Sequence, residues 1–131
     1  VTYHDAYAYF AENFGWQVVG AVQPSDFADP TPSEVVTLIE QIRTEGVPTI
    51  FGSEVFPSNV LEEVGNETGV RYEQSLRDDD LPGAPGEENH SWLGLMQYNF
   101  ATMIEGLGGD ASNVRAVDIT SPVPDNADYP Q

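Results

Sequence analysis

The chain has 131 residues, of which 22 are Asp or Glu and four are Lys or Arg, so its formal net charge is −18 at pH 7. This charge excludes a protein that binds nucleic acid or an anionic membrane surface, because such partners are bound through Lys and Arg. The absence of cysteine excludes a disulfide framework and a zinc ribbon, so any zinc would be bound by His and carboxylate groups.

The length and composition predict one globular domain with its own core, since 40% of the residues are hydrophobic. No apolar run approaches the roughly 18 residues of a membrane span. The acidic residues are spread along the chain, which is more typical of a soluble or salt-adapted surface than of one cation site. The sequence opens at Val1 inside an apparent strand, so we expect a piece whose upstream half is missing.

The first part of the chain predicts a strand, a helix and a second strand. A β-branched run favours a strand over residues 1–4, which ends at His4. Aromatic residues then recur at spacings of three and four, which predicts a helix over residues 5–14, capped by Asp5 and ended by Gly15 in a left-handed conformation. The next strand is expected over residues 16–22.

Two further β/α units follow. Thr31 and Glu34 form a predicted capping box around Pro32, and the helix that they begin is expected over residues 32–45. We expect strands at residues 48–52 and 70–74, with a helix at residues 58–67 between them. The last helix is expected over residues 91–107, with a core face composed of Leu93, Met96, Phe100, Met103, Ile104 and Leu107.

The alternation of strands and helices predicts an α/β fold, in which a mainly parallel four-stranded sheet is flanked by helices on both faces. We assign residues 1–108 to a single lobe and residues 109–131 to an extended tail, within which residues 114–119 form a strand or pack against an edge. A long acidic loop over residues 78–89 precedes the last helix.

Polar residues follow the predicted strands at the edge of the sheet where open α/β domains bind ligands. They are His4, Asp26, Asp29, Glu54 and the run Asp78, Asp79 and Asp80. One imidazole with several carboxylates is a ligand set suited to Zn²⁺ or Mn²⁺. His90, by contrast, precedes the last helix, and we expect it on the surface near the helix cap.

The residues around His4 form a motif that suggests a family. His4-Asp5-Ala6-Tyr7 is followed by Tyr9-Phe10, by Phe14-Gly15 and by the strand Val18-Val19-Gly20. This pattern resembles the start of the C-terminal lobe in the extracytoplasmic metal-binding proteins of zinc and manganese ABC transporters. The resemblance covers residues 1–107 and implies that His4 is a metal ligand. Some manganese members have Glu there, so His4 favours Zn²⁺, with Mn²⁺ as the alternative.

The same resemblance implies two further site residues. In this family an Asp between two leucines, a dozen or so residues before a helix with Met-x-Tyr-Asn, is a metal ligand. Here Leu76 and Leu81 bracket three aspartates ahead of the segment 96–99, which places Asp79 at the ligand position, with Asp78 as the alternative. Glu54 resembles a family Glu that we expect to orient a ligand through a hydrogen bond.

The resemblance implies a metal-binding component of an ABC uptake system outside the cytoplasm, not an enzyme. The other two ligands, both histidines, would belong to a missing N-terminal lobe, and the metal would pass to an ABC permease. One alternative is an acidic interaction module of this fold that has lost metal binding. Another is a hydrolase that uses a metal or a His–carboxylate pair, although the sequence lacks a Gly-x-Ser-x-Gly elbow and a phosphate loop.

Overall fold

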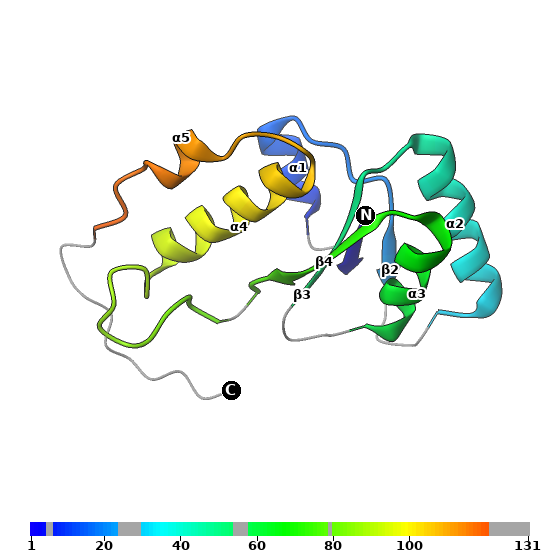
Figure 1. Ribbon diagram of the computed structural model, residues 1–131, viewed down its shortest axis with the longest axis horizontal. Coiled ribbons are helices and arrows are strands. Elements are labelled where there is room, and N and C mark those ends of the chain that lie inside the picture. The colour runs from blue at the N-terminus through cyan, green and yellow to red at the C-terminus, as the bar shows by residue number, and fades with distance from the viewer. Residues whose placement is uncertain (5–6, 24–29, 54–57, 79, 121–131) are drawn as a thin grey trace. The chain divides into compact units, whose positions relative to one another are not determined.

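A computed structural model describes residues 1–4, 7–23, 30–53, 58–78 and 80–120 of the chain (Figure 1). Strands and helices alternate along it, which confirms the predicted α/β class. The chain forms two compact units: Val1–Gly52 with Phe56–Gln74, and Ser53–Val55 with Ser75–Gln131. The assignment of residues 1–108 to a lobe and residues 109–131 to a tail stays a prediction.

Four short strands form one sheet in the order β2-β1-β3-β4. They are β1 (Thr2–His4), β2 (Ala21–Gln23), β3 (Thr49–Ser53) and β4 (Arg71–Leu76). β1 runs parallel to both of its neighbours, with Thr2 opposite Ala21 on one side and Phe51 on the other. The predicted parallel, four-stranded sheet is confirmed, and an inner strand of this sheet carries His4 at its carboxyl end.

The second strand differs from its prediction, because it begins at Ala21 instead of Trp16 and includes Gln23. Its partner β1 has three residues, and a strand extends only where a neighbour supplies hydrogen-bonding groups. Trp16 instead packs edge-on against Phe10, with the ring centroids 5.5 Å apart.

The described residues form five helices, which are α1 (Ala8–Phe14), α2 (Pro32–Glu45), α3 (Asn59–Thr68), α4 (Trp92–Gly106) and α5 (Ser112–Arg115). The capping box at α2 is confirmed: Thr31 N–H donates to Glu34 Oε2 at 2.7 Å, and Glu34 N–H donates to Thr31 Oγ1 at 3.4 Å. α1 begins later than expected, with Tyr7 at its N-cap, and Asp5, the expected cap, lies outside the described residues. α5 takes the place of the start of the strand considered at residues 114–119.

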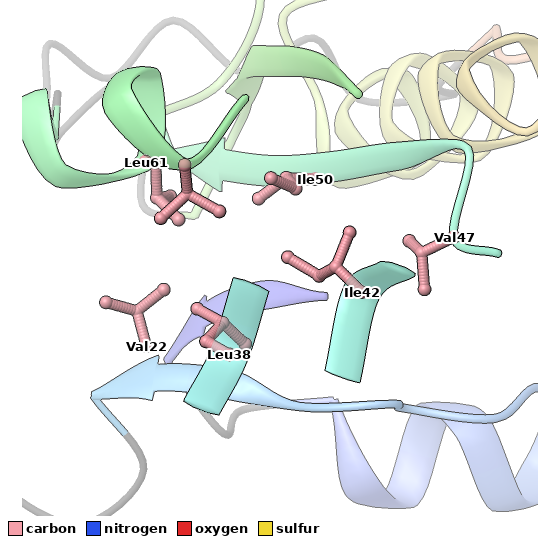
Figure 2. Close-up of a cluster of buried hydrophobic side chains, with 7 residues drawn as sticks. Val22, Leu38, Ile42, Val47, Ile50 and Leu61 are labelled. Atoms are coloured by element: carbon pink, nitrogen blue, oxygen red, sulfur yellow. The ribbon is translucent and has the colours of Figure 1, made fainter. Parts of the chain in front are cut away.

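The core of the first unit lies between α2, α3 and the sheet (Figure 2). Its members share nearly complete burial and are Val22, Leu38, Ile42, Val47, Ile50, Leu61 and Val64. They come from β2, α2, β3, α3 and the turn before β3, so this cluster joins elements that are distant in sequence. Burial of each large side chain contributes roughly 1.5–3 kcal/mol.

The buried face of α4 was predicted wrongly at two positions. Leu93 and Leu107 are 46% and 44% exposed, whereas Met103 is buried as expected. The buried residues of this helix are mostly small: Gly94, Asn99, Ala101, Met103 and Gly106. A Cβ atom on Gly94 would lie 2.0 Å from the carbonyl oxygen of Asn89, so close approach of backbone decides which side packs inward.

None of the helices in the described part of the chain is long and apolar enough to cross a bilayer.

Candidate metal site

His4 is the last residue of β1 and is half-buried. Its Nε2 atom is shielded from solvent, and its ring lies edge-on to the ring of Tyr3, with the centroids 4.7 Å apart. The carbonyl oxygen of His4 accepts a hydrogen bond of 2.9 Å from the hydroxyl of Thr2. The strand therefore holds the backbone and the ring of His4 at the carboxyl edge, as the sequence predicts.

Gln23 lies opposite His4 in the parallel pairing of β2 with β1. It is 6% exposed, so a carboxamide is buried at the same edge of the sheet. The predicted strand ends at residue 22, so Gln23 was not among the expected site residues. The available signal was the strand register, because residues that pair across parallel strands lie on the same face.

The second unit contains the chain segment that leads into the acidic run. The side chain of Asn99, on α4, bridges both backbone polar groups of Arg77: Arg77 N–H donates to Asn99 Oδ1 at 2.9 Å, and Asn99 Nδ2 donates to the carbonyl oxygen of Arg77 at 2.7 Å. The Arg77 guanidinium lies 5.4 Å from the ring centroid of Tyr98. Two adjacent residues of α4 thus hold the residue that precedes the acidic run.

The acidic run is described at two of its three positions. Asp78 is exposed and Asp80 is half-buried, whereas Asp79 lies outside the described residues. Glu54, Asp26 and Asp29 also lie outside them. The convergence of His4 with Asp79 or Asp78, and the orienting role of Glu54, therefore stay predictions. Within the described residues, no group of three or more His, Asp or Glu side chains is arranged to hold a metal ion.

The other histidine was placed wrongly. His90 is 7% exposed, not on the surface, although it lies beside the helix cap as expected. Its backbone N–H donates to the carbonyl oxygen of Glu87 at 3.0 Å, which turns the chain inward before Ser91 caps α4. A tight turn over residues 87–91 therefore buries an imidazole that the polar sequence around it had suggested to be exposed.

The family model for ZnuA, described as zinc-uptake complex component A, periplasmic, matches residues 1–106. Two curated relatives are lipoproteins. The manganese-binding lipoprotein MntA of Halalkalibacterium halodurans is 23% identical over 103 residues, which make up 79% of this chain and 34% of the relative. The manganese ABC transporter substrate-binding lipoprotein PsaA of Streptococcus pneumoniae serotype 4 is 25% identical over 107 residues, or 82% of this chain and 34% of the relative.

Solved structures agree on the fold. A Mn-bound periplasmic metal-binding protein from Candidatus Liberibacter asiaticus superposes with a TM-score of 0.67 and 25% identity, over 82% of this chain and 39% of that chain. The periplasmic zinc-binding protein TroA from Treponema pallidum gives a TM-score of 0.68 and 23% identity, over 81% and 40%. The chain thus spans about a third of the length of the curated relatives that it matches.

Proposed function

The chain belongs to the ZnuA family, and from this membership we propose that it forms part of an extracytoplasmic component that binds a metal ion for an ABC uptake system. Family members of this kind bind and deliver a solute, so we propose no catalytic reaction. The names of the relatives support the class of cargo, since MntA and PsaA are named for manganese and TroA for zinc. The partner that we propose is an ABC permease.

The observation that carries this proposal is the position of His4. An imidazole at the carboxyl end of an inner parallel strand is held where open α/β sheets bind ligands, and it has a shielded Nε2 atom. We propose His4 and Asp79 as ligands, with Asp78 as the alternative to Asp79 and Glu54 as the residue that orients a ligand. Both Zn²⁺ and Mn²⁺ accept imidazole and carboxylate ligands. We propose Zn²⁺ as the cargo, because position 4 is His and not Glu, with Mn²⁺ as the alternative.

The proposed site is shared with another lobe. A protein zinc site takes about four ligands. In this proposal the chain supplies two of them, and Glu54 orients one of the two through a hydrogen bond. The remaining ligands would come from a lobe that precedes this chain in the whole protein. We propose that the metal is captured between the two lobes and released to the permease when they separate, in an extracytoplasmic compartment.

The test is calorimetric titration of the full-length protein with Zn²⁺ and with Mn²⁺. His4→Ala removes a proposed ligand, and loss of one outer partner alone already costs about 10–100-fold in metal affinity, so we expect a loss at least that large. His90→Ala is the matched control, because it removes the only other imidazole of this chain from the start of α4. Unchanged affinity in His4→Ala, or an equal loss in both variants, would contradict the proposed site.

A further inference from the structure

The bridge between Asn99 and Arg77 has a feature that packing alone does not require. Asn99 is 7% exposed and lies within α4, where Asn is a poorer helix former than Ala or Leu. A buried carboxamide is costly unless its polar atoms are hydrogen-bonded. The carboxamide oxygen and nitrogen of Asn99 both form hydrogen bonds with the backbone of Arg77, which lies in another segment. Asn99 is therefore matched to the backbone of Arg77 and not to its own helix.

Arg77 is also held by its side chain. The guanidinium lies 5.4 Å from the centroid of the Tyr98 ring, within the range of a cation–π interaction. Arg77 is half-buried, so this charged group packs against α4 instead of extending into solvent. The neighbouring helix residues Tyr98 and Asn99 thus hold the side chain and the main chain of the same arginine. Their combined effect is to fix the backbone where β4 ends and residues 78–80 begin.

We infer that Asn99 is a positioning residue for the proposed metal ligands. By holding the N–H and the C=O of Arg77, it sets the direction in which the chain leaves β4 and enters the acidic run, to which the proposed ligand Asp79, or its alternative Asp78, belongs. This inference rests on the proposed function for the identity of the ligand. The chemistry resembles that of outer partners at other metal sites, where hydrogen bonds orient the ligating group before the metal arrives.

The helix offers a matched control two residues away. Gln97 is also a carboxamide on α4, and its Nε2 atom donates to the carbonyl oxygens of Val114 at 3.0 Å and Val117 at 2.9 Å. Gln97→Ala therefore removes the same kind of side chain-to-backbone tie from the same helix. The tie that it removes holds residues 114–117 and not Arg77.

The experiment titrates Mn²⁺ alone into the full-length protein in 1 M KCl, where the screening length of about 3 Å suppresses diffuse attraction to the acidic surface. Paramagnetic broadening of the amide signals of His4 and residues 77–80 reports local binding. In Asn99→Ala we expect the Mn²⁺ concentration for half-broadening to rise about tenfold. In Gln97→Ala we expect it to stay within about twofold of the unmodified chain, as for a distant, independent substitution.

A second readout needs no metal. The heteronuclear NOE of residues 77–80 should fall in Asn99→Ala and stay unchanged in Gln97→Ala, whereas the NOE of residues 114–117 should show the reverse. Asn99→Ser, with a hydroxyl too short to bridge both groups of Arg77, provides a second variant if Asn99→Ala does not fold. Equal loosening of residues 77–80 in the Asn99 and Gln97 variants, or no loosening in either, would overturn the inference.

Failure of the proposed function gives a different result. If Mn²⁺ broadens no signal of His4 or residues 77–80 in the unmodified full-length protein at 1 M KCl, the proposed ligands are wrong. The NOE comparison then still decides whether Asn99 orders the segment that carries the aspartates. Ordered residues 77–80 without Mn²⁺ binding would restrict Asn99 to a structural role and overturn its assignment as a positioning residue for metal ligands.

Discussion

Glu34 and Glu45 lie at opposite ends of α2, and the helix dipole acts on their charges with opposite sign. Glu34 is in the first turn, where its carboxylate accepts hydrogen bonds from the N–H and hydroxyl of Thr31, and these bonds lower the pKa of Glu34. Glu45 is the last residue of the helix, where the unsatisfied carbonyl groups disfavour a negative charge.

The same substitution at these two positions should therefore have opposite effects. Glu45→Gln removes an unfavourable charge and should raise the melting temperature by about 1–4 °C at low salt. Glu34→Gln removes a favourable charge from the capping box and should lower it. Thermal unfolding followed by circular dichroism in 0.05 M KCl measures both changes. Shifts of the same sign in the two variants would contradict the dipole argument.

Repulsion among the acidic residues should also make the stability of the fold depend on salt concentration. Glu63 and Glu67 are one turn apart on α3, a spacing at which like charges destabilise a helix. The chain has a net charge of −18. Among the described residues there are two Arg–carboxylate ion pairs, Arg71–Glu73 and Arg115–Glu105. The screening length falls from about 10 Å at 0.1 M salt to about 3 Å at 1 M, which is shorter than the spacing of neighbouring carboxylates, so their repulsion weakens.

We expect 2 M KCl to raise the melting temperature by about 10 °C relative to 0.1 M KCl. Sucrose at equal osmolarity is the control, because it favours burial without screening charge. Glu63→Gln combined with Glu67→Gln should reduce the dependence on salt. A melting temperature that does not depend on KCl, or an equal rise in sucrose, would show that charge repulsion is not what limits stability.

A third prediction concerns zinc binding by the 131-residue chain alone. With two of about four ligands, we expect weak binding without a fixed stoichiometry, since the attraction of the net charge is diffuse and screened. His4→Ala should remove the part of the calorimetric signal that persists in 1 M KCl. Tight one-to-one binding in 0.1 M salt that is lost in His4→Ala would show that this chain holds a complete site.

Tyr72 should make stability depend on pH in the alkaline range. Burial raises the pKa of Tyr72, while a 3.4 Å hydrogen bond that its hydroxyl oxygen accepts from Ser58 N–H opposes this shift. A raised pKa in the folded state means that folding favours the neutral phenol. Its contribution to stability is complete below about pH 10, the unfolded value, and is lost as the pH rises through the folded value.

The free energy of unfolding should therefore fall above pH 10, and Tyr72→Phe should make this fall shallower. Urea titrations at pH 9 and pH 11 measure the difference. Tyr9→Phe is the control, because Tyr9 is 86% exposed. An equally steep fall in Tyr72→Phe and in the unmodified chain would contradict the assignment.

The core prediction compares two positions of α2. Ile42 is 1% exposed and contacts the cluster between α2, α3 and the sheet, so Ile42→Ala should cost about 2–5 kcal/mol of unfolding free energy. Val36 is 55% exposed on the same helix, so Val36→Ala should change it by less than about 0.5 kcal/mol. Urea denaturation measures both values, and a similar cost for the two would mean that the core lies elsewhere.

The sequence by itself determined the order and type of the main elements, because the signals for them are local. Gly15 ends α1 with a φ angle of 67°, as its position after a periodic segment predicts. The Thr31 and Glu34 capping box likewise depends on residues three apart. His4 could be placed at a strand end because that signal is also local, and the family could be identified from the sequence motif around His4.

Tertiary structure decided what depends on residues distant in sequence. α4 is apolar on several sides, so periodicity could not show that Gly94 and Ala101 face inward while Leu93 is exposed. The short β1 decided that Gln23 joins the sheet opposite His4. The burial of Asn99 depends on Arg77, 22 residues earlier, because a carboxamide becomes stable inside a protein only when the fold brings its hydrogen-bonding partners to it.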